Sequence, residues 1–428
     1  MLDLRFIREH VDVVRKAIAD KGERTDLDGL LAADERRREL LQKVEALRHA
    51  RNEASQQVNE LKKSGKDASA VIARVRAMSQ ESKDLERELA EVEEKVAHLL
   101  LTVPNIPAPD VPMGRTGADN VEVRRWGNPP RFEFQPRAHW DIGSDLDILD
   151  FERAAKVAGS NFALFKGAGA RLVRALYCFM LDLHTREHGY TEVFPPFLVN
   201  RAAMTGTGQL PKLEEDMYHL DADDLFLIPT AEVPVTNLYR EELLSHEDLP
   251  IRLTAYTACF RREAGSYGRE TRGLLRVHQF DKVEMVKFVH PDKSYEELES
   301  LLACAEAVMQ LLGLHYRVMK LCTGELSFSG TKCYDIEAYA PGVDRWLEVS
   351  SCSSFEDFQA RRANIRFRDA DGKVKFVHTL NGSGVALARL IACILETYQQ
   401  EDGSVRLPAC LAPYMGGTET IVPWSVGR

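Results

Sequence analysis

The sequence predicts an α+β protein with two parts: an antiparallel coiled-coil hairpin, and a domain built on a mainly antiparallel β-sheet flanked by helices. Residues 34–101 contain no proline, are dense in charge, and place apolar residues at alternating spacings of four and three. After residue 137, short apolar runs cluster as hairpins instead of alternating regularly with helices. Heptad spacing is typical of coiled coils, and clustered strands favour antiparallel pairing over a doubly wound nucleotide fold.

The first element expected is a short amphipathic helix over residues 3–21. Leu4, Ile7, Val11, Val14 and Ile18 recur at spacings of three and four, and Gly22 follows as a stop signal.

Two long helices are expected next. With the short helix they form a predicted N-terminal domain, residues 1–101. Lys63–Asp67 separates two heptad runs, so the helices must fold back on each other as an arm roughly 45 Å long. The two polar exceptions at heptad positions are Arg51 and Ser82. The runs are Leu40, Val44, Leu47, Arg51, Ala54, Val58 and Leu61, then Val71, Val75, Met78, Ser82, Leu85, Leu89, Val92, Val96 and Leu99.

Charge is unevenly distributed along this arm. Residues 77–98, near its base, are mainly acidic, whereas residues 48–76, around its tip, are mainly basic. The basic residues at the tip are Arg48, Arg51, Lys62, Lys63, Lys66, Arg74 and Arg76. One interpretation is a probe that contacts RNA phosphates; the alternatives are an ordinary solvated coiled-coil surface or a dimerisation stalk.

A proline-rich linker, residues 102–136, precedes the second domain, residues 137–428. Six prolines and scattered glycines predict no regular structure in the linker. In the second domain helices are expected at 168–187, 295–312 and 385–398. A strand followed by a proline turn is expected at 190–199. Further strands are expected at 225–228, 255–260, 274–287, 315–321, 333–340, 345–350 and 365–368.

Composition limits the function classes. A net charge of −10 over 428 residues argues against general nucleic-acid coating, so any RNA contact must be local. The eight cysteines form no CxxC pair and indicate reduced thiols, with neither a zinc nor a disulfide pattern. The N-terminus lacks a signal-peptide pattern and no stretch reaches membrane-spanning length, which predicts a soluble, cytoplasmic protein without a membrane partner.

Three constellations carry candidate chemistry. Five arginines lie between positions 261 and 276, in a hairpin loop with three glycines, and indicate either polyanion binding or a solvated basic loop. Glu348–Ser351, at a predicted strand end, offers oxygen ligands suited to Mg²⁺. Asn381–Gly384, a predicted loop, precedes a helix that carries Arg389 in its first turn. Arginines beside a cation site suit phosphoryl or nucleotidyl transfer, although each motif alone is common at strand ends and turns.

Together and in this order, these segments resemble the three signature motifs of class II aminoacyl-tRNA synthetases. Gly189–Pro196 resembles motif 1. Phe260–Glu263, together with the loop that follows it, resembles motif 2, and Gly382–Arg389 resembles motif 3. The finer resemblance is to the bacterial-type seryl-tRNA synthetase family, and it covers nearly the whole chain. Besides the arm, it includes Pro104–Pro107, Thr207–Lys212, Thr230–Glu232, Arg261–Gly273, His278–Phe280 and Thr379–Ser383.

This resemblance implies a class II catalytic domain that activates L-serine with ATP and Mg²⁺, forming seryl-adenylate. The seryl group is then transferred to the 3′ end of serine tRNA, with selenocysteine tRNA a further candidate. The resemblance also implies a homodimer joined through motif 1, and an arm that recognises the long variable arm of the tRNA.

Site residues are carried over from the same resemblance. Catalytic roles fall to Arg261, Glu284 and Arg389: Arg261 contacts the ATP α-phosphate and the serine carboxylate, Glu284 the amino acid, and Arg389 the γ-phosphate. The ATP site comprises Arg261, Arg262, Glu263, Arg276, Val277, Phe280, Glu348, Val349, Ser350, Ser351 and Arg389, with Glu263 and Phe280 on adenine and Glu348 and Ser351 on Mg²⁺. The serine pocket comprises Thr230, Ala231, Glu232, Arg261, Glu284, Asn381 and Ser383.

Two details and two alternatives remain at this stage. Arg262 departs from the family pattern, which often has a small polar residue there, and the loop Gly265–Gly273 is expected to be mobile and to meet the tRNA acceptor end. One alternative function is an amino-acid:carrier-protein ligase that has lost tRNA charging. The other is a non-enzymatic, coiled-coil RNA-binding or scaffold protein.

Overall fold

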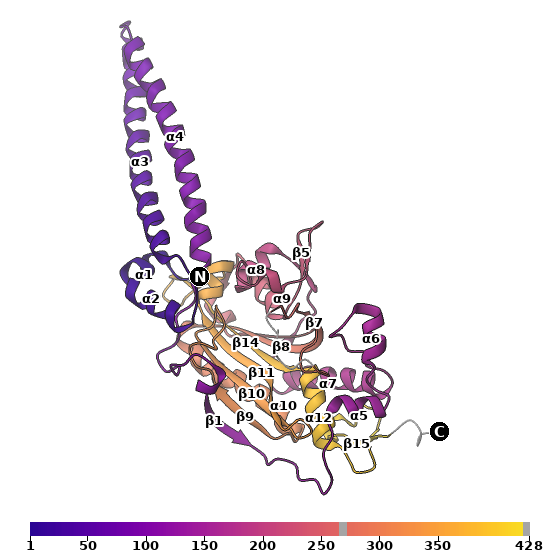
Figure 1. Ribbon diagram of the computed structural model, residues 1–428. Coiled ribbons are helices and arrows are strands. Elements are labelled where there is room, and N and C mark those ends of the chain that lie inside the picture. Colours follow the sequence, from indigo (N-terminus) through magenta and orange to yellow (C-terminus); the bar gives the residue numbers. More distant parts are fainter. Residues whose placement is uncertain (265–271, 423–428) are drawn as a thin grey trace. The chain divides into compact units, whose positions relative to one another are not determined.

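The computed structural model describes residues 1–264 and 272–422 and divides into two compact units (Figure 1). One unit contains residues 2–19 and 23–104; the other contains Met1, residues 20–22 and residues 105–428. The predicted three-part division, with boundaries after residues 101 and 136, stays a proposal.

The first unit begins with two short helices, α1 (Leu4–Glu9) and α2 (Val11–Asp20), where the sequence predicts one. The backbone leaves the helical conformation at His10, with φ −133° and ψ 44°, and the next helix starts immediately. The apolar spacing continues across this break, which is why periodicity alone did not reveal it.

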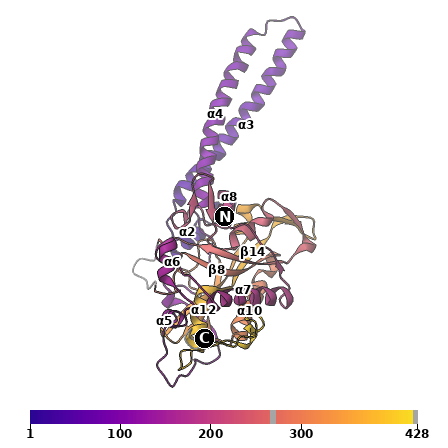
Figure 2. The same cartoon turned by 90° about the vertical axis from the view of Figure 1, so that its right-hand side faces the viewer.

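Helices α3 (Leu27–Lys63) and α4 (Ser69–Leu101) form the predicted antiparallel hairpin, and they lie side by side along its length in both views (Figures 1 and 2). All the predicted heptad positions are buried or half-buried. The polar exception Ser82 is 2% exposed, and its hydroxyl donates to the Glu86 carboxylate at 3.0 Å. The Ser82 hydroxyl, at a buried position between the two helices, is therefore accommodated by a local hydrogen bond.

The second unit is built on an eight-stranded sheet with the order β1-β9-β10-β11-β14-β8-β7-β2. Neighbouring strands pair antiparallel, except β2 and β7, which are parallel. The strands are β1 (Val121–Trp126), β2 (Thr191–Glu192), β7 (Ile251–Phe260), β8 (Gln279–Val289), β9 (Tyr316–Lys320), β10 (Lys332–Ala340), β11 (Arg345–Glu356) and β14 (His378–Ala386). The predicted α+β fold class is confirmed.

Helices cover both faces of this sheet, because strand residues alternate between two cores. In β8, Val283 and Met285 join the larger core with α7 (Ala168–Arg186), α10 (Ser294–Leu311) and α12 (Leu387–Tyr398), which lie together on one side of the sheet (Figure 2). Val286 and Phe288 face the other core, which includes α9 (Glu232–Thr236), α11 (Phe358–Ala363) and a small sheet.

The small sheet has the order β13-β12-β6, formed by β6 (Leu243–Ser245), β12 (Arg366–Arg368) and β13 (Val374–Phe376). A second small sheet, β3-β5-β4, contains β3 (Leu198–Asn200), β4 (His219–Leu220) and β5 (Leu225–Leu227). The remaining α-helices and strands are α5 (His139–Asp145), α6 (Phe151–Ala158), α8 (Arg201–Thr207), β15 (Val405–Arg406) and β16 (Thr420–Ile421).

One segment predicted as irregular linker forms an edge strand. Strand β1 pairs with β9, although all six of its residues are exposed. Its hold on the sheet comes from side chains: Trp126 stacks on Tyr316 with ring centroids 5.8 Å apart, and Arg124 pairs with the buried Glu306. A strand with no buried face lacks the apolar alternation by which strands are recognised in sequence.

The boundaries at three motif segments also differ from expectation. The second hairpin strand begins at Gln279 instead of residue 274, because Leu274, Leu275 and Val277 are buried in the core without strand pairing. Asn381–Gly384 lies inside β14, and Glu348–Ser351 lies inside β11 instead of at its end.

Gly382 explains why a glycine motif forms a strand here. A Cβ atom at this position would come within 2.9 Å of Leu301 and 3.0 Å of Cys352. The glycine therefore permits close packing of α10 and β11, where the sequence suggested a turn.

Among the described helices, none is long and apolar enough to cross a membrane.

Candidate active site

A cavity of about 480 Å³ opens over strands β8, β11 and β14, beside the start of α12. It brings together most of the predicted site residues, although they come from distant parts of the sequence. Those that line it are Thr230, Glu232, Arg261, Glu263, Arg276, Val277, Phe280, Glu348, Val349, Ser350, Ser351, Asn381, Ser383 and Arg389. Ala231, Arg262 and Glu284 do not line it.

Glu284 lies directly beneath this lining and is 1% exposed. Its carboxylate accepts a hydrogen bond of 2.9 Å from the Asn381 side-chain amide and is paired with the ammonium of Lys282. Lys282 also donates to the Thr230 hydroxyl at 2.9 Å. The antiparallel pairing of β8 with β14 places Glu284 opposite Ser383, so these strands set the geometry of this end.

Glu232 is a second buried carboxyl group at the same end. The Gln359 amide donates to it at 2.6 Å, and the Gln359 carbonyl in turn accepts from Thr379 at 2.7 Å. Burial, followed by the repulsion of the Glu284 carboxylate, raises the pKa of Glu232 to about 7. Two carboxyl groups and one lysine therefore leave this pocket able to accept a further cationic group.

Arginines form a second part of the cavity lining. The Arg261 guanidinium lies 5.2 Å from the centre of the Phe280 ring, and its Nε donates to the carbonyl of Pro229 at 3.3 Å. Arg389 donates to the carbonyls of Leu275 and Glu348, at 3.2 and 2.8 Å. These backbone contacts fix both guanidinium groups while leaving donors for an anion.

Glu263 adopts a left-handed backbone conformation, with φ 52°. This conformation is unfavourable for a residue with a Cβ atom and is concentrated at functional sites. Its carboxylate accepts from Arg276 Nη1 at 3.1 Å, so the hairpin turn holds an acidic and a basic side chain together at the cavity wall.

The predicted Mg²⁺ ligands, Glu348 and Ser351, gain a third oxygen donor that sequence reasoning missed. Ser351 pairs in register with Asp335 of the neighbouring strand β10. Burial, and then the Glu348 carboxylate, hold the pKa of Asp335 well above its usual range. Two mutually repelling carboxyl groups beside a hydroxyl suit a hard cation with oxygen ligands, so these residues fit Mg²⁺.

The arginines of the hairpin do not act as one cluster. Arg261 and Arg276 line the cavity, whereas Arg272 lies over the Trp140 ring, 4.5 Å from its centre, and is exposed. Arg262 lies outside the lining. Arg269 and most of the predicted mobile loop, Gly265–Gly273, fall in residues 265–271, outside the described part of the chain.

Lys282, Gln359 and Asp335 are the main residues that sequence reasoning missed. Lys282 and Glu284 lie two residues apart on one strand face, so strand alternation pointed to Lys282. Asp335 meets Ser351 only through the pairing of β10 with β11, which the sequence does not show. Gln359 reaches the site from α11, and nothing in its local sequence indicates this role.

Comparisons with known proteins agree with this geometry. The seryl-tRNA synthetase N-terminal domain family matches residues 1–107, and the class II tRNA synthetase core domain family (G, H, P, S and T) matches residues 215–398. The serine--tRNA ligase of Geobacillus sp. (strain WCH70) is 60% identical over 423 residues, covering 98% of this chain and 100% of its own. The serine--tRNA ligase of Desulforapulum autotrophicum is 54% identical, and the match covers 98% of this chain and 99% of that protein.

Two solved structures extend this likeness to the fold. The seryl-tRNA synthetase of Pyrococcus horikoshii, complexed with ATP, superimposes with a TM-score of 0.92 at 37% identity, covering 99% of this chain and all of its own. The cytoplasmic serine-tRNA ligase of Naegleria fowleri, in complex with AMP, superimposes with a TM-score of 0.88 at 28% identity, and the match covers 99% of each chain. The chain therefore belongs to the seryl-tRNA synthetase family.

Proposed function

We propose that this protein is a class II serine--tRNA ligase. It joins L-serine to the α-phosphate of ATP and then transfers the seryl group to the 3′ end of serine tRNA, with selenocysteine tRNA a further candidate substrate. The observation that carries this proposal is the single cavity lined both by Arg261, Arg276 and Arg389 and by Glu232 and Asn381, the latter bonded to Glu284. A nucleoside triphosphate needs the first set, and a small amino acid the second.

The amino-acid end selects a substrate by hydrogen bonding and charge. Glu232 and Glu284 offer carboxylate acceptors for the ammonium and hydroxyl groups of serine. Thr230 and Ser383 add hydroxyl groups to the serine pocket, and Ala231 adds a backbone group beside them. Asn381 and Lys282 hold the Glu284 carboxylate in place, so its hydrogen bond is preorganised. A pocket built around such a bond rejects analogues that lack the partner group by about 10⁴–10⁵.

Adenylation requires charge neutralisation more than covalent participation of the protein. A serine carboxylate oxygen attacks the α-phosphorus, a P–O bond forms, and the bond to the β-phosphate breaks to release pyrophosphate. Arg261 neutralises charge on both the carboxylate and the α-phosphate, while Arg276 and Arg389 stabilise the departing phosphates. The carbonyl contacts of Arg261 and Arg389 hold these groups in position before the substrates bind.

The remaining cavity residues position the nucleotide. Phe280 offers an aromatic face to adenine, and Glu263 accepts a hydrogen bond from its amino group. Val277, Val349 and Ser350 shape the walls around the ring and ribose. Mg²⁺ held by Glu348, Ser351 and Asp335 would supply further neutralisation of the phosphate charge.

The helical hairpin is proposed to bind the long variable arm of serine tRNA. Lys62, Lys63, Lys66, Arg74 and Arg76 are exposed around its tip, as phosphate contacts require. Arg48 contributes less, because it is bonded to Glu86 at 3.0 Å. Recognition by shape and backbone is common for RNA helices.

A homodimer is proposed through the segment that resembles motif 1. Phe194 in this segment is 76% exposed, and its ring lies 5.6 Å from that of Phe197. An exposed aromatic side chain such as Phe194 is typical of a protein–protein interface. A cytoplasmic location accompanies this proposal, since translation supplies the tRNA substrate.

The decisive experiment is ATP–pyrophosphate exchange with each of the twenty amino acids. Serine alone should support strong exchange, and a folded protein that shows none with serine would overturn the proposal. Charging of serine tRNA separates the synthetase from a carrier-protein ligase or a scaffold, because only the synthetase forms seryl-tRNA.

The arm is tested separately by reversing charge at its tip. The double variant Lys62→Glu with Lys63→Glu should retain serine-dependent exchange but lose tRNA charging efficiency, and the salt dependence of tRNA binding should weaken by about one unit of slope per lost contact. The matched control, Lys83→Glu with Lys95→Glu, reverses two exposed lysines in the acidic half of the arm. Equal losses in both variants would contradict a phosphate-binding tip.

A further inference from the structure

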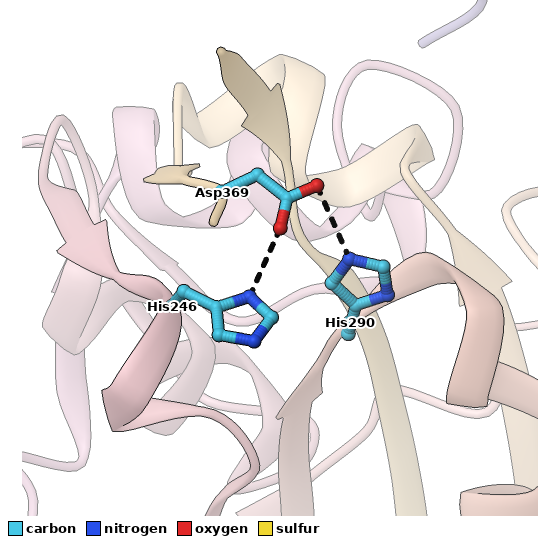
Figure 3. Close-up of side chains that lie close together, drawn as sticks. All are labelled: His246, His290 and Asp369. Carbon is cyan, nitrogen blue, oxygen red and sulfur yellow. Dashed lines mark hydrogen bonds and ion pairs between the residues drawn. The ribbon is translucent and has the colours of Figure 1, made fainter. Parts of the chain in front are cut away.

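Three side chains that bind metals meet at a corner of the fold outside the active-site cavity: His246, His290 and Asp369 (Figure 3). The topology explains the meeting. Strands β6 and β12 are parallel, and Ser245 is paired with Arg368, so His246 and Asp369 emerge side by side at the same sheet edge. His290 follows the last residue of β8, which reaches the same corner.

The three donors point at one another. His246 Nδ1 lies 3.0 Å from Asp369 Oδ1, and His290 Nε2 lies 3.5 Å from Asp369 Oδ2 (Figure 3). One ligand atom from each residue fits within a mutual separation of 4.8 Å. Ligands of a tetrahedral zinc, bound at about 2.0–2.2 Å, lie roughly 3.3–3.6 Å apart, which these spacings approach.

We propose that His246, His290 and Asp369 bind a Zn²⁺ ion, with a fourth position open to solvent. Two imidazoles and a carboxylate are zinc ligands, and three protein ligands leave one site for water. The side chains of Asp369 and His290 are 10% and 18% exposed, which makes two ligands rigid, while His246 is 46% exposed and forms the open side. Such an ion would tie the ends of β6, β8 and β12 together.

The neighbours of the cluster supply the second shell that a zinc site needs. The Lys375 ammonium pairs with Asp369 Oδ2 and orients the carboxylate. Asp369 Oδ1 remains beside His246 and keeps a lone pair after accepting from the backbone of Ala370 at 2.7 Å.

Asp292 holds the His290 ring in place. Its backbone N–H donates to His290 Nδ1 at 3.2 Å, so Nε2 faces Asp369. Zinc binding through Nε2 moves the ring proton to Nδ1 and exchanges this hydrogen bond for a contact with the Asp292 carboxylate, which lies 3.7 Å from Nδ1.

Zinc titration by calorimetry, after chelator treatment of the full-length protein, tests the site. The unmodified protein should bind one more Zn²⁺ per chain than His290→Ala or Asp369→Asn, or bind it at least about tenfold more tightly. The matched control is His219→Ala, because His219 contacts Asp221 and Asp224 at 2.8 and 2.9 Å without converging donors. The same zinc stoichiometry and affinity in all four proteins would overturn the proposal.

Two further measurements guard against misfolded variants and binding to cysteines. Zinc should raise the melting temperature of the unmodified protein and of His219→Ala, but not that of Asp369→Asn or of His246→Ala, which removes the most exposed ligand. Co²⁺ in place of zinc should give visible d–d bands without a thiolate charge-transfer band. A thiolate band that persists in the variants would place the metal on cysteine and refute this site.

Discussion

Glu232→Gln is the perturbation whose size follows most directly from the structure. The substitution keeps the side-chain oxygen that accepts from Gln359 but removes the charge that must be buried beside Glu284. The pKa of Glu232 rises from an ordinary 4.5 to about 7 on folding, so ionised Glu232 disfavours the folded state. At about 1.4 kcal/mol per tenfold change, this difference corresponds to about 3 kcal/mol above pH 7.

The sign of the pH dependence follows from proton binding. Between pH 4.5 and 7 the folded state holds a proton that the unfolded state has lost, so this group stabilises the fold at low pH and its contribution is lost as the pH rises to about 7. Glutamine has no such titration. Glu232→Gln should therefore match the unmodified protein near pH 5 and exceed its melting temperature by roughly 5 °C at pH 8.

Thermal melting of both proteins without substrates, in steps from pH 5 to pH 8.5, measures this difference. Serine-dependent exchange in parallel should show the opposite effect, with a serine KM raised about 10- to 100-fold, because a charged acceptor for the ammonium group is lost. A melting-temperature difference that does not change with pH would refute the reasoning, since burial of an ionisable carboxyl group would then not be its cause.

Three further predictions follow from other contacts. Glu284→Ala should raise the serine KM far more than the ATP KM in exchange assays, and equal effects on both would remove Glu284 from the amino-acid pocket. Gly382→Ala should lower the free energy of unfolding by about 1–3 kcal/mol in urea titrations, because its Cβ would lie within 2.9 Å of Leu301; unchanged stability would contradict this packing. Asp335→Asn should raise the Mg²⁺ concentration needed for half-maximal exchange, whereas an unchanged requirement would exclude Asp335 from the cation site.

Much of the candidate site was predictable because its residues lie in short ordered motifs. The segments around Arg261, Glu348 and Asn381 were identified from their residues, and the structure gathers nearly all of them around one cavity. Their local conformations were less predictable. A glycine pair that reads as a loop forms the middle of β14, because packing against α10 and β11 overrides the turn preference of glycine.

The sequence by itself determined the elements that depend on local periodicity. The arm helices and the long core helices follow from apolar spacing, because burial of one face is repeated along each helix. The antiparallel character of the sheet follows from the clustering of short apolar runs as hairpins. Only the tertiary structure decided which side chains from distant segments meet. It brings Gln359 to Glu232, Asp335 to Ser351, and His246 to Asp369, through strand register and helix packing that no local pattern encodes. The raised pKa of Glu232 is also decided by the tertiary structure, since it arises from burial and from Glu284 on strand β8.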